Sequence, residues 1–547
     1  MTAAERELSP RRPAISPRYG WPLLLVLMSA LVRYGLSLQY QMISAADSPT
    51  YVSVARALED GTIVKDEGGR TPGYPLLLLA SAQSTWAVQM ALGVLTGLLL
   101  YHCCLLLTGN APLSFAVGLS QSLNLAQIFF EAVVAPETLT TLLVTGTVTA
   151  LVAASDPDRP TRRCKRLALI AGVAAGAAAI TRPQYVFLPA VVALIVWVAA
   201  RRRPSLSQPG AARWATVAMA PGLITVLAWS GFNYFRHDYF TLSTFMGINL
   251  TNHTIAFVES VAQRHRETAD ILIRYREQKI QRTGRHAMAV WEALPELQAA
   301  TGQSRTQISK QLASLSVRLI LRHPLGYAQS VLHAWKDFWM VPILWAPDKL
   351  ESVSVRRALV AIWEMEKWLL RILNASFLVL VFLAVVRLPR RARKAWNLQL
   401  TTVAAVILGS SLLQALVEYG ENPRYAVTVE PLVILVIAVL AYRFLLAMPP
   451  SSGERCRLDS LPSTTDVAGG SPTGYLTTAS GSRVSASTPL SCSTTTKMGG
   501  RLPSLERRRQ HAQRARNVVD RCREPSDPSF EPEDFLTCGL MYCTSER

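Results

Sequence analysis

Residues 85–107 read TWAVQMALGVLTGLLLYHCCLLL and contain no Asp, Glu, Lys or Arg. A helix of about 20 such residues is long enough to cross the ~30 Å hydrocarbon core of a bilayer. Similar apolar runs recur along the first 450 residues, where short arginine-rich loops separate them. A soluble domain would instead interrupt its apolar residues with charge at every helical turn. The chain is therefore predicted to be a polytopic membrane protein.

The apolar runs predict an all-α fold, a transmembrane bundle of about ten spans with surface helices in its outer loops. The spans are expected at 21–40, 85–107, 111–130, 134–154, 167–181, 185–200, 213–232, 369–387, 397–418 and 427–447. The first span follows a basic start and has no small-residue cleavage site behind it. This favours a retained signal anchor.

The short loops predict how the chain is oriented. Arginine-rich segments precede the first span and recur at 159–166, 201–213 and 387–394. Positively charged loops stay in the cytoplasm, and an alternating ten-span path puts all of these segments on one side. We therefore expect both termini to lie inside. The Ala-, Leu- and Arg-rich composition suggests a bacterial origin, and with it the plasma membrane. The loop 41–84 and a helical region, 233–366, are expected outside.

The chain is expected to have three parts: a cytoplasmic N-terminus (1–20), the transmembrane module (21–447) and a disordered cytoplasmic tail (448–547). The tail is rich in Ser, Thr, Pro and Gly and includes a basic run, which we interpret as a solvated charge cluster rather than a lipid-binding one. The net charge is +19. Membrane lipid, and no nucleic acid, is the expected surrounding partner. The eight cysteines predict neither a disulfide framework nor a zinc site.

Charged residues at the outer ends of the spans are the candidates for chemistry. Asp47 follows the first span, with Ser48 and Pro49 expected as the cap and first residue of a surface helix. The plain alternative is a carboxylate that merely favours a helix N-terminus. Arg70, in RTPGYP (70–75), suits a phosphate, which a guanidinium grips with two donors. The alternative there is a snorkelling arginine.

Further candidates come from three other turns. Glu137, and with less weight Glu131, is a carboxylate at the membrane, where insertion scales put the cost at about 2.5–3.5 kcal/mol. Arg182 lies in a TRPQY turn and Arg424 in EYGENPRY (418–425); either could be an interfacial anchor. Topology nevertheless puts both on the same face as Asp47, Arg70 and Glu137. Such a set can deprotonate an acceptor hydroxyl and stabilise a phosphate leaving group.

In these residues and their order the sequence resembles the GT-C fold glycosyltransferases. Within them it is most similar to the bacterial branch related to protein O-mannosyltransferases and lipid A aminoarabinose transferases. The resemblance covers roughly residues 20–447. It rests on DSPTYVSVA (47–55), RTPGYP (70–75), TRP (181–183), FNY through LS (232–243), RHPLGY (322–327) and the final Arg424-Tyr425.

The resemblance implies a sugar donor on a polyprenyl phosphate and an acceptor hydroxyl on a glycan, lipid or protein. It implies direct displacement with inversion at the anomeric carbon, on the periplasmic or extracytoplasmic side. Asp47 would be the general base and Glu137 the second acid. The predicted substrate-binding residues are Arg70, Tyr74, Arg182, Glu421, Arg424 and Tyr425, of which the arginines are candidates to hold the lipid phosphate.

The sequence also departs from the family. Asp47 is followed by Ser48 where some relatives have two adjacent acids. The first loop has no Asp-x-Asp metal site, so no cofactor and no divalent metal are predicted. The region 233–366 is expected to lack the folded domain of several relatives. A transporter or flippase of a lipid-linked anion is the main alternative, and a non-catalytic assembly subunit is a third. A transporter predicts repeated halves with broken helices, and no repeat is found.

Overall fold

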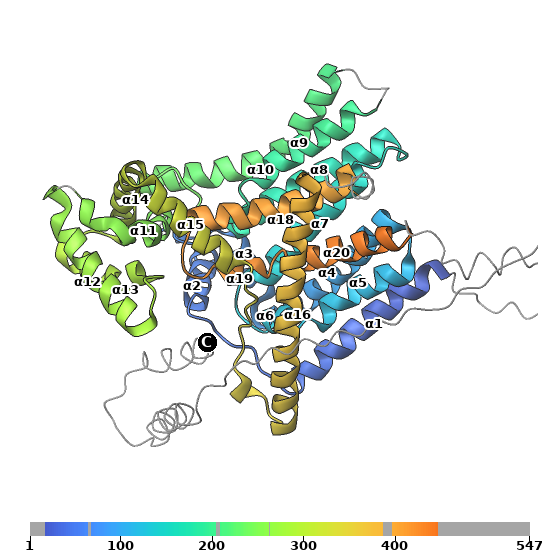
Figure 1. Cartoon of the computed structure of the whole chain (residues 1–547), viewed down its shortest axis with the longest axis horizontal. Helices are drawn as coiled ribbons and strands as arrows, with labels where there is room; N and C mark the ends of the chain where they lie inside the picture. Colours follow the sequence, from blue (N-terminus) through green and yellow to red (C-terminus); the bar gives the residue numbers. More distant parts are fainter. Residues whose placement is uncertain (1–16, 64–66, 204–207, 262, 387–395, 447–547) are drawn as a thin grey trace, which may run out of the picture. The chain divides into compact units, whose positions relative to one another are not determined.

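The structure, a computed structural model, describes residues 17–63, 67–203, 208–261, 263–386 and 396–446 (Figure 1). Within these ranges the regular structure is helical, apart from a single parallel bridge between Ile43 and Val133. The predicted all-α fold is therefore confirmed. The predicted tail, 448–547, and most of the predicted N-terminal segment lie outside the described residues.

The helices that matter below follow one another along the chain as follows. They are α1 (Pro17–Ser37), α2 (Ser48–Glu59), α3 (Gly73–Ser81), α4 (Thr85–Thr108), α5 (Ala111–Leu123), α6 (Leu125–Glu131), α7 (Glu137–Ala154), α8 (Thr161–Thr181), α9 (Leu188–Arg201), α10 (Gln208–His237), α11 (Met246–Thr254), α12 (Arg266–Thr283), α13 (Ala289–Thr301), α14 (Arg305–Arg322), α15 (Pro324–Phe338), α16 (Val353–Val385), α18 (Leu398–Val417), α19 (Asn422–Ala426) and α20 (Glu430–Leu446).

The described residues contain eight helical stretches long and apolar enough to cross a membrane, or nine if the bent pair α5–α6 counts as one span. The bend of 55° lies at Asn124, whose side chain accepts a hydrogen bond from the Gln127 backbone and so starts α6. The tenth expected span, 427–447, corresponds to α20, which has only 17 residues. The chain is a multi-pass membrane protein.

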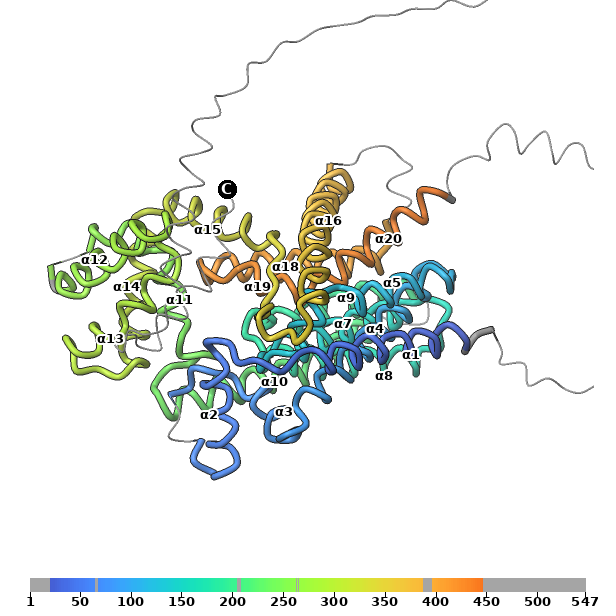
Figure 2. Tube along the Cα trace, turned by 90° about the horizontal axis from the view of Figure 1, so that it is seen from below, coloured from blue at the N-terminus to red at the C-terminus, as the bar shows by residue number. Residues whose placement is uncertain are grey.

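One predicted span is part of a longer element. Residues 369–385 of that span form the second half of α16, a helix of 33 residues that begins at Val353 behind the capping side chain of Ser352. No Gly or Pro interrupts 353–385, so the surface segment and the span continue as one helix. In Figures 1 and 2, α16 runs steeply across α20, which it contacts.

Small residues let the helices of the bundle approach closely. A Cβ on Gly172 of α8 would collide with the carbonyl oxygen of Ala218 in α10, and one on Gly176 would lie 2.8 Å from the Cα of Gly222. Helices in membranes associate through such backbone contacts, because apolar surface alone gains little there. The small residues of α8 thus fix its packing against α10.

A buried ion pair joins α1 to α6. Arg33 donates to Glu131 through Nε at 2.8 Å and through Nη2 at 2.6 Å, and both side chains are almost fully buried. Gly93 of α4 leaves the space for this pair, since a Cβ there would collide with it. A carboxylate inside a membrane bundle needs such a partner. Glu131, the less favoured candidate, is thus engaged in holding the bundle together.

The region 233–366, which is called the outer region below after its expected location, has a hydrophobic core of its own. Helices α11 to α14 enclose Ile248, Leu272, Leu294 and Leu312, and Leu315 and Leu319 of α14 are buried there as well. The region is therefore more compact than the sequence predicted. Figures 1 and 2 show α11–α14 at the same end of the bundle as α2, opposite the start of α1.

Candidate active site

Asp47 is held in place by its neighbours and not by capping α2. It occupies the N-cap position but makes no capping hydrogen bond within the described structure, so the expected cap at Ser48 is wrong by one residue. Ser48 instead fixes the chain: its Oγ donates to the Val134 carbonyl at 2.8 Å and accepts from the Ala45 backbone at 2.7 Å. The Asp47 carboxylate is therefore free to face other segments.

Arg70 reaches Asp47 from the loop before α3. Its Nη2 lies 2.5 Å from Asp47 Oδ1, and its Nε donates to Thr50 Oγ1 at 2.9 Å. The guanidinium also lies over the rings of Tyr51, at 4.7 Å, and Phe245, at 5.4 Å. These contacts on both sides orient one edge of Arg70 towards Asp47.

Gly69 allows this approach. A Cβ at position 69 would collide with the ring of Phe245, so only glycine lets the loop pass beneath that ring. Two residues further on, Thr71 donates to the Thr181 carbonyl at 3.2 Å. The Arg70 loop is thereby tied to the end of α8, from which the next arginine projects.

Glu137 and two arginines form the inner part of the site. Glu137 opens α7, its side chain is fully buried, and its Oε1 accepts from both Arg182 Nη2 and Arg424 Nε. Arg424 also donates through Nη1 to Asp47 at 2.9 Å and to Glu421 at 3.1 Å. Arg182 lies 4.5 Å from the ring centre of Tyr425. Segments from four distant parts of the chain thus meet in one cluster.

Tyr74 has a different environment. It is fully buried, and its hydroxyl donates to Gln89 Oε1 at 2.8 Å; Gln89 in turn donates to the backbone carbonyls of Glu131 and Val133. The hydroxyl of Tyr74 is thus bound to Gln89 and not to the cluster. The other seven predicted site residues lie together in the cluster: Asp47, Arg70, Glu137, Arg182, Glu421, Arg424 and Tyr425. Their roles in binding and catalysis stay predictions.

The charges in the cluster balance. Asp47, Glu137 and Glu421 face the guanidinium groups of Arg70, Arg182 and Arg424. Burial works to raise the pKa of Asp47, but the nearby positive charges, Arg70 first, hold it below its ordinary value. Asp47 is thus ionised at neutral pH.

The cluster also has unused hydrogen-bonding capacity. Arg182 Nε, Arg424 Nη2 and Glu137 Oε2 are buried without a hydrogen-bond partner in the described part of the chain. Leaving a buried donor unpaired costs about 1–3 kcal/mol, and more for a charged group. Two unpaired guanidinium donors beside a neutralised cluster are suited to an anion that enters the site.

Sequence reasoning missed the surroundings of these residues. Phe245, beneath Gly69 and Arg70, carried no signal because it comes from the outer region. Glu418, in the predicted EYGENPRY turn, was not chosen, although it is buried and accepts from Gln414 at 3.0 Å. Among the residues described, no group of three or more His, Cys, Asp or Glu is placed to hold a metal ion. The need for a metal therefore stays untested.

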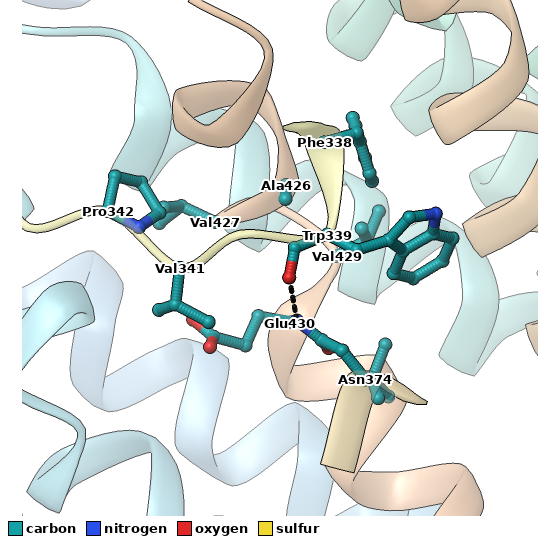
Figure 3. Close-up of a pocket in the computed structure, with 10 residues that line it drawn as sticks. Phe338, Trp339, Val341, Pro342, Asn374, Ala426, Val427, Val429 and Glu430 are labelled. Carbon is teal, nitrogen blue, oxygen red and sulfur yellow. Dashed lines mark hydrogen bonds between the residues drawn. The ribbon is translucent and has the colours of Figure 1, made fainter. Parts of the chain in front are cut away.

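A small cavity begins two residues after Arg424, between the end of α15, α16 and the start of α20 (Figure 3). Its volume is about 10 Å³, enough for one water molecule. Glu430 reaches it, and Asn374 closes one side by donating to the Trp339 carbonyl at 3.0 Å. The remaining lining is apolar: Phe338, Val341, Pro342, Ala426, Val427, Val429 and Val433. A sugar does not fit in this space.

Fold and site together define a multi-pass helical membrane protein with a buried cluster of arginines and carboxylates. Comparisons with known protein families and with curated proteins find no match. Among solved structures, the chain is similar to the crystal structure of ArnT from Cupriavidus metallidurans bound to undecaprenyl phosphate. The similarity covers 77% of this chain and 78% of that chain, with 13% sequence identity and a TM-score of 0.32.

Proposed function

We propose that this protein is a membrane glycosyltransferase that moves a sugar from a polyprenyl-phosphate carrier to an acceptor hydroxyl. The observation that carries the proposal is the cluster itself. Three guanidinium groups and two carboxylates converge on one point. Arg70 comes from the loop before α3, Arg182 from the end of α8 and Arg424 from α19. The buried Glu137 comes from the start of α7, and the partly exposed Asp47 from the loop before α2. A phosphate leaving group and a nearby general base need this combination of groups.

The reaction is a direct displacement. Asp47 accepts the proton of the acceptor hydroxyl, whose oxygen attacks the anomeric carbon from the face opposite the phosphate. The bond between that carbon and the phosphate oxygen breaks, and the polyprenyl phosphate leaves with the electron pair. Inversion at the anomeric carbon follows. The unpaired donors of Arg182 and Arg424 support stabilisation of the departing phosphate.

The ion pairs of Asp47 give it a way to respond to the donor. Arg70 and Arg424 now hold the pKa of this carboxylate down and make it a weak base. A donor phosphate that draws the two guanidinium groups towards itself weakens these pairs, and the pKa of Asp47 then rises towards its ordinary value. Asp47 thus becomes a stronger base when the donor is bound. It then takes the proton of the acceptor hydroxyl more readily, at the stage when a sugar is present for transfer.

We place this site on the periplasmic or extracytoplasmic side. The positive-inside rule supports that placement, because the arginine-rich segments fall on the opposite side in the predicted path. Glu137 is proposed to orient Arg182 and Arg424, both of which it binds, and not to touch the acceptor.

The test is the turnover of radiolabelled polyprenyl-phosphate sugars by purified protein, comparing wild type with Asp47→Asn. The substitution keeps the shape and removes the base, so transfer and donor hydrolysis are expected to fall about 100-fold or more. Asp238→Asn, the same change at an exposed ion pair with Lys310, is the matched control and should retain activity. Donor binding without bond cleavage by wild type would instead favour a transporter or flippase of lipid-linked anions.

A further inference from the structure

Helix α11 has contacts near the cluster at both of its ends. At its start, the ring of Phe245 contacts the guanidinium of Arg70, with 5.4 Å between the charged carbon and the ring centre. At its end, His253 stacks against Tyr419, with ring centres 5.9 Å apart. Tyr419 is two residues from Glu421, so their Cα atoms are at most about 7 Å apart. The helix thus extends from one side of the cluster to the other.

One side of α11 is occupied by α14. The Gly247 backbone donates to Ser309 Oγ at 3.1 Å, while the hydroxyls of Thr251 and Thr254 each lie 2.9 Å from Ser316 Oγ. At about 100° per residue, a helix with positions 247, 251 and 254 on one side carries 249, 252 and 253 on the other. Asn249, Asn252 and His253 therefore point away from α14.

The contacts of His253 show where that other side is directed. Its ring packs between Tyr419 and Tyr327, with a centre-to-centre distance of 5.5 Å to the second, and its Nδ1 lies 2.8 Å from Ser330 Oγ. Tyr419 lies in the turn after α18. Tyr327 donates to the Leu416 carbonyl, which lies at the end of α18. That turn leads directly into Glu421 and Arg424. The side is thus directed to the segment that supplies the cluster.

Four polar atoms on this side of α11 have no hydrogen-bond partner among the described residues: Asn249 Oδ1, both amide atoms of Asn252 and His253 Nε2. The Asn252 and His253 side chains are fully buried, and the His253 ring also meets Ser330 and the backbone of Glu418 and Ala415. Each such atom costs about 1–3 kcal/mol unless a ligand or solvent satisfies it. Native structures contain only a few per 100 residues, so three adjacent side chains call for an explanation. Asn422, next to Glu421, is likewise buried with both amide atoms unpaired.

We propose that Asn249, Asn252 and His253 of α11 form the subsite for an uncharged sugar ring on the lipid-linked donor. This inference rests on the proposed function and names its substrate class. An amide side chain offers both a donor and an acceptor, which matches the hydroxyl groups of a sugar.

The set of side chains argues for a neutral sugar. Asn249, Asn252 and Asn422 carry no charge, and burial lowers the pKa of His253 to about 4, so this ring is neutral too. The nearest carboxylates are already engaged: Glu421 pairs with Arg424, and Glu418 accepts from Gln414. With both of these carboxylates engaged, an amino group on the sugar would gain less here than a hydroxyl group would.

The experiment measures how tightly the detergent-solubilised full chain binds two lipids, a bare polyprenyl phosphate and a polyprenyl-phosphate hexose. Wild type is expected to bind the hexose lipid at least tenfold more tightly. In Asn252→Leu, which keeps the size and removes both amide groups, the two lipids should bind equally, with the bare lipid unchanged. Thr251→Val, one residue away and directed at α14, is the matched control and should keep the tenfold difference.

The outcomes separate the subsite from the function. Equal binding of both lipids by wild type, a preserved difference in Asn252→Leu, or tighter binding of an aminopentose or uronic acid lipid would overturn the subsite alone. A loss of bare-lipid binding in Asn252→Leu would mean that Asn252 supports the fold, and would also overturn it. If wild type binds neither lipid, the proposed function fails and the subsite with it. Binding of the hexose lipid without turnover would remove the transferase and leave the subsite intact.

Discussion

Arg424 Nη1 donates to Asp47 Oδ2 at 2.9 Å, although 377 residues separate the two in the sequence. The same guanidinium binds Glu137 through Nε and Glu421 through Nη1. One side chain therefore links the first outer loop, the start of α7 and the turn after α18. Without it, three carboxylates would face one another with two cations left to neutralise them, Arg70 and Arg182.

Replacing Arg424 is therefore expected to destabilise the fold as well as the site. Arg424→Gln should lower the free energy of unfolding by about 3 kcal/mol, the lower end for a broken buried pair, because Arg70 and Arg182 remain. Arg424→Lys keeps the charge but loses the planar guanidinium group. Its free energy of unfolding should therefore lie between those of wild type and Arg424→Gln. Thermal unfolding in detergent micelles measures both changes.

Arg274→Gln is the matched control. Arg274 pairs with Glu296 at 2.9 Å in the outer region, but about half of its side chain is exposed. Exposed pairs contribute about 0–1 kcal/mol, so the midpoint should hardly move. Equal shifts in the two variants would show that Arg424 is no more than a surface charge.

Hydropathy and loop charge were enough to predict the helical fold and to predict that the candidate site residues lie at one end of the bundle. Alternating spans put Asp47, Arg70, Glu137 and Arg424 at the same end, because each lies next to the end of a span. The pairing of individual groups could not be predicted. It depends on how far α2 and α19 fold back over the bundle, and this is decided by contacts such as that of Ser48 with the Val134 carbonyl.

Three features of the structure carried no clear signal in the sequence. The hydroxyl of Tyr74 lies on Gln89 because that glutamine, a lone amide in an apolar run, needs a partner inside the bundle. The helix that carries the span expected at 369 begins earlier, at Val353, because a change from amphipathic to apolar sequence does not end a helix. The core of α11–α14 was missed because long-range packing leaves only a stripe of leucines in the sequence.

The pair of Arg33 and Glu131 is expected to stabilise the bundle without acting in transfer. Arg33→Met and Glu131→Met should each cost about 3–5 kcal/mol, since each leaves a buried charge unpaired. The double variant should cost clearly less than the sum, because both charges are then gone. Unfolding of the four proteins in detergent gives the coupling. Simple additivity of the two changes would show that the pair does not interact.

The stability of the outer region should fall in mild acid. Burial lowers the pKa of His253 and of His286 from 6.5 to about 4. Between these values the unfolded chain binds more protons than the folded one, so stability decreases as the pH is lowered from about 6.5 to about 4, and levels off below. His253→Gln removes one of these groups and should flatten the dependence of the melting temperature on pH.

His323→Gln is the control for this experiment. His323 packs against Phe257 and is not among the groups that act on His253 or His286, so its replacement should leave the slope unchanged. A slope that stays the same in His253→Gln would mean that other groups cause the acid sensitivity. The groups that face the His253 ring are Ser330, Tyr327, Tyr419, the backbone of Glu418 and Ala415, and the nearby His286. Of these only His286 shares the lowered pKa, so His286→Gln is the next variant to measure.

Two glycines of the bundle should respond to alanine in opposite directions. A Cβ on Gly172 would collide with the Ala218 carbonyl oxygen, so Gly172→Ala must push α8 and α10 apart and should cost about 1–3 kcal/mol. Gly231 also lies within a helix, α10, but in the described structure nothing stands within 4 Å of a Cβ there. Gly231→Ala should therefore stabilise the protein by about 0.5–1 kcal/mol through helix propensity. Melting temperatures in one detergent compare the two. If both variants gain stability, α8 and α10 do not pack in the close register that places Gly172 against Ala218, and the arrangement that carries Arg182 to the cluster would have to change with it.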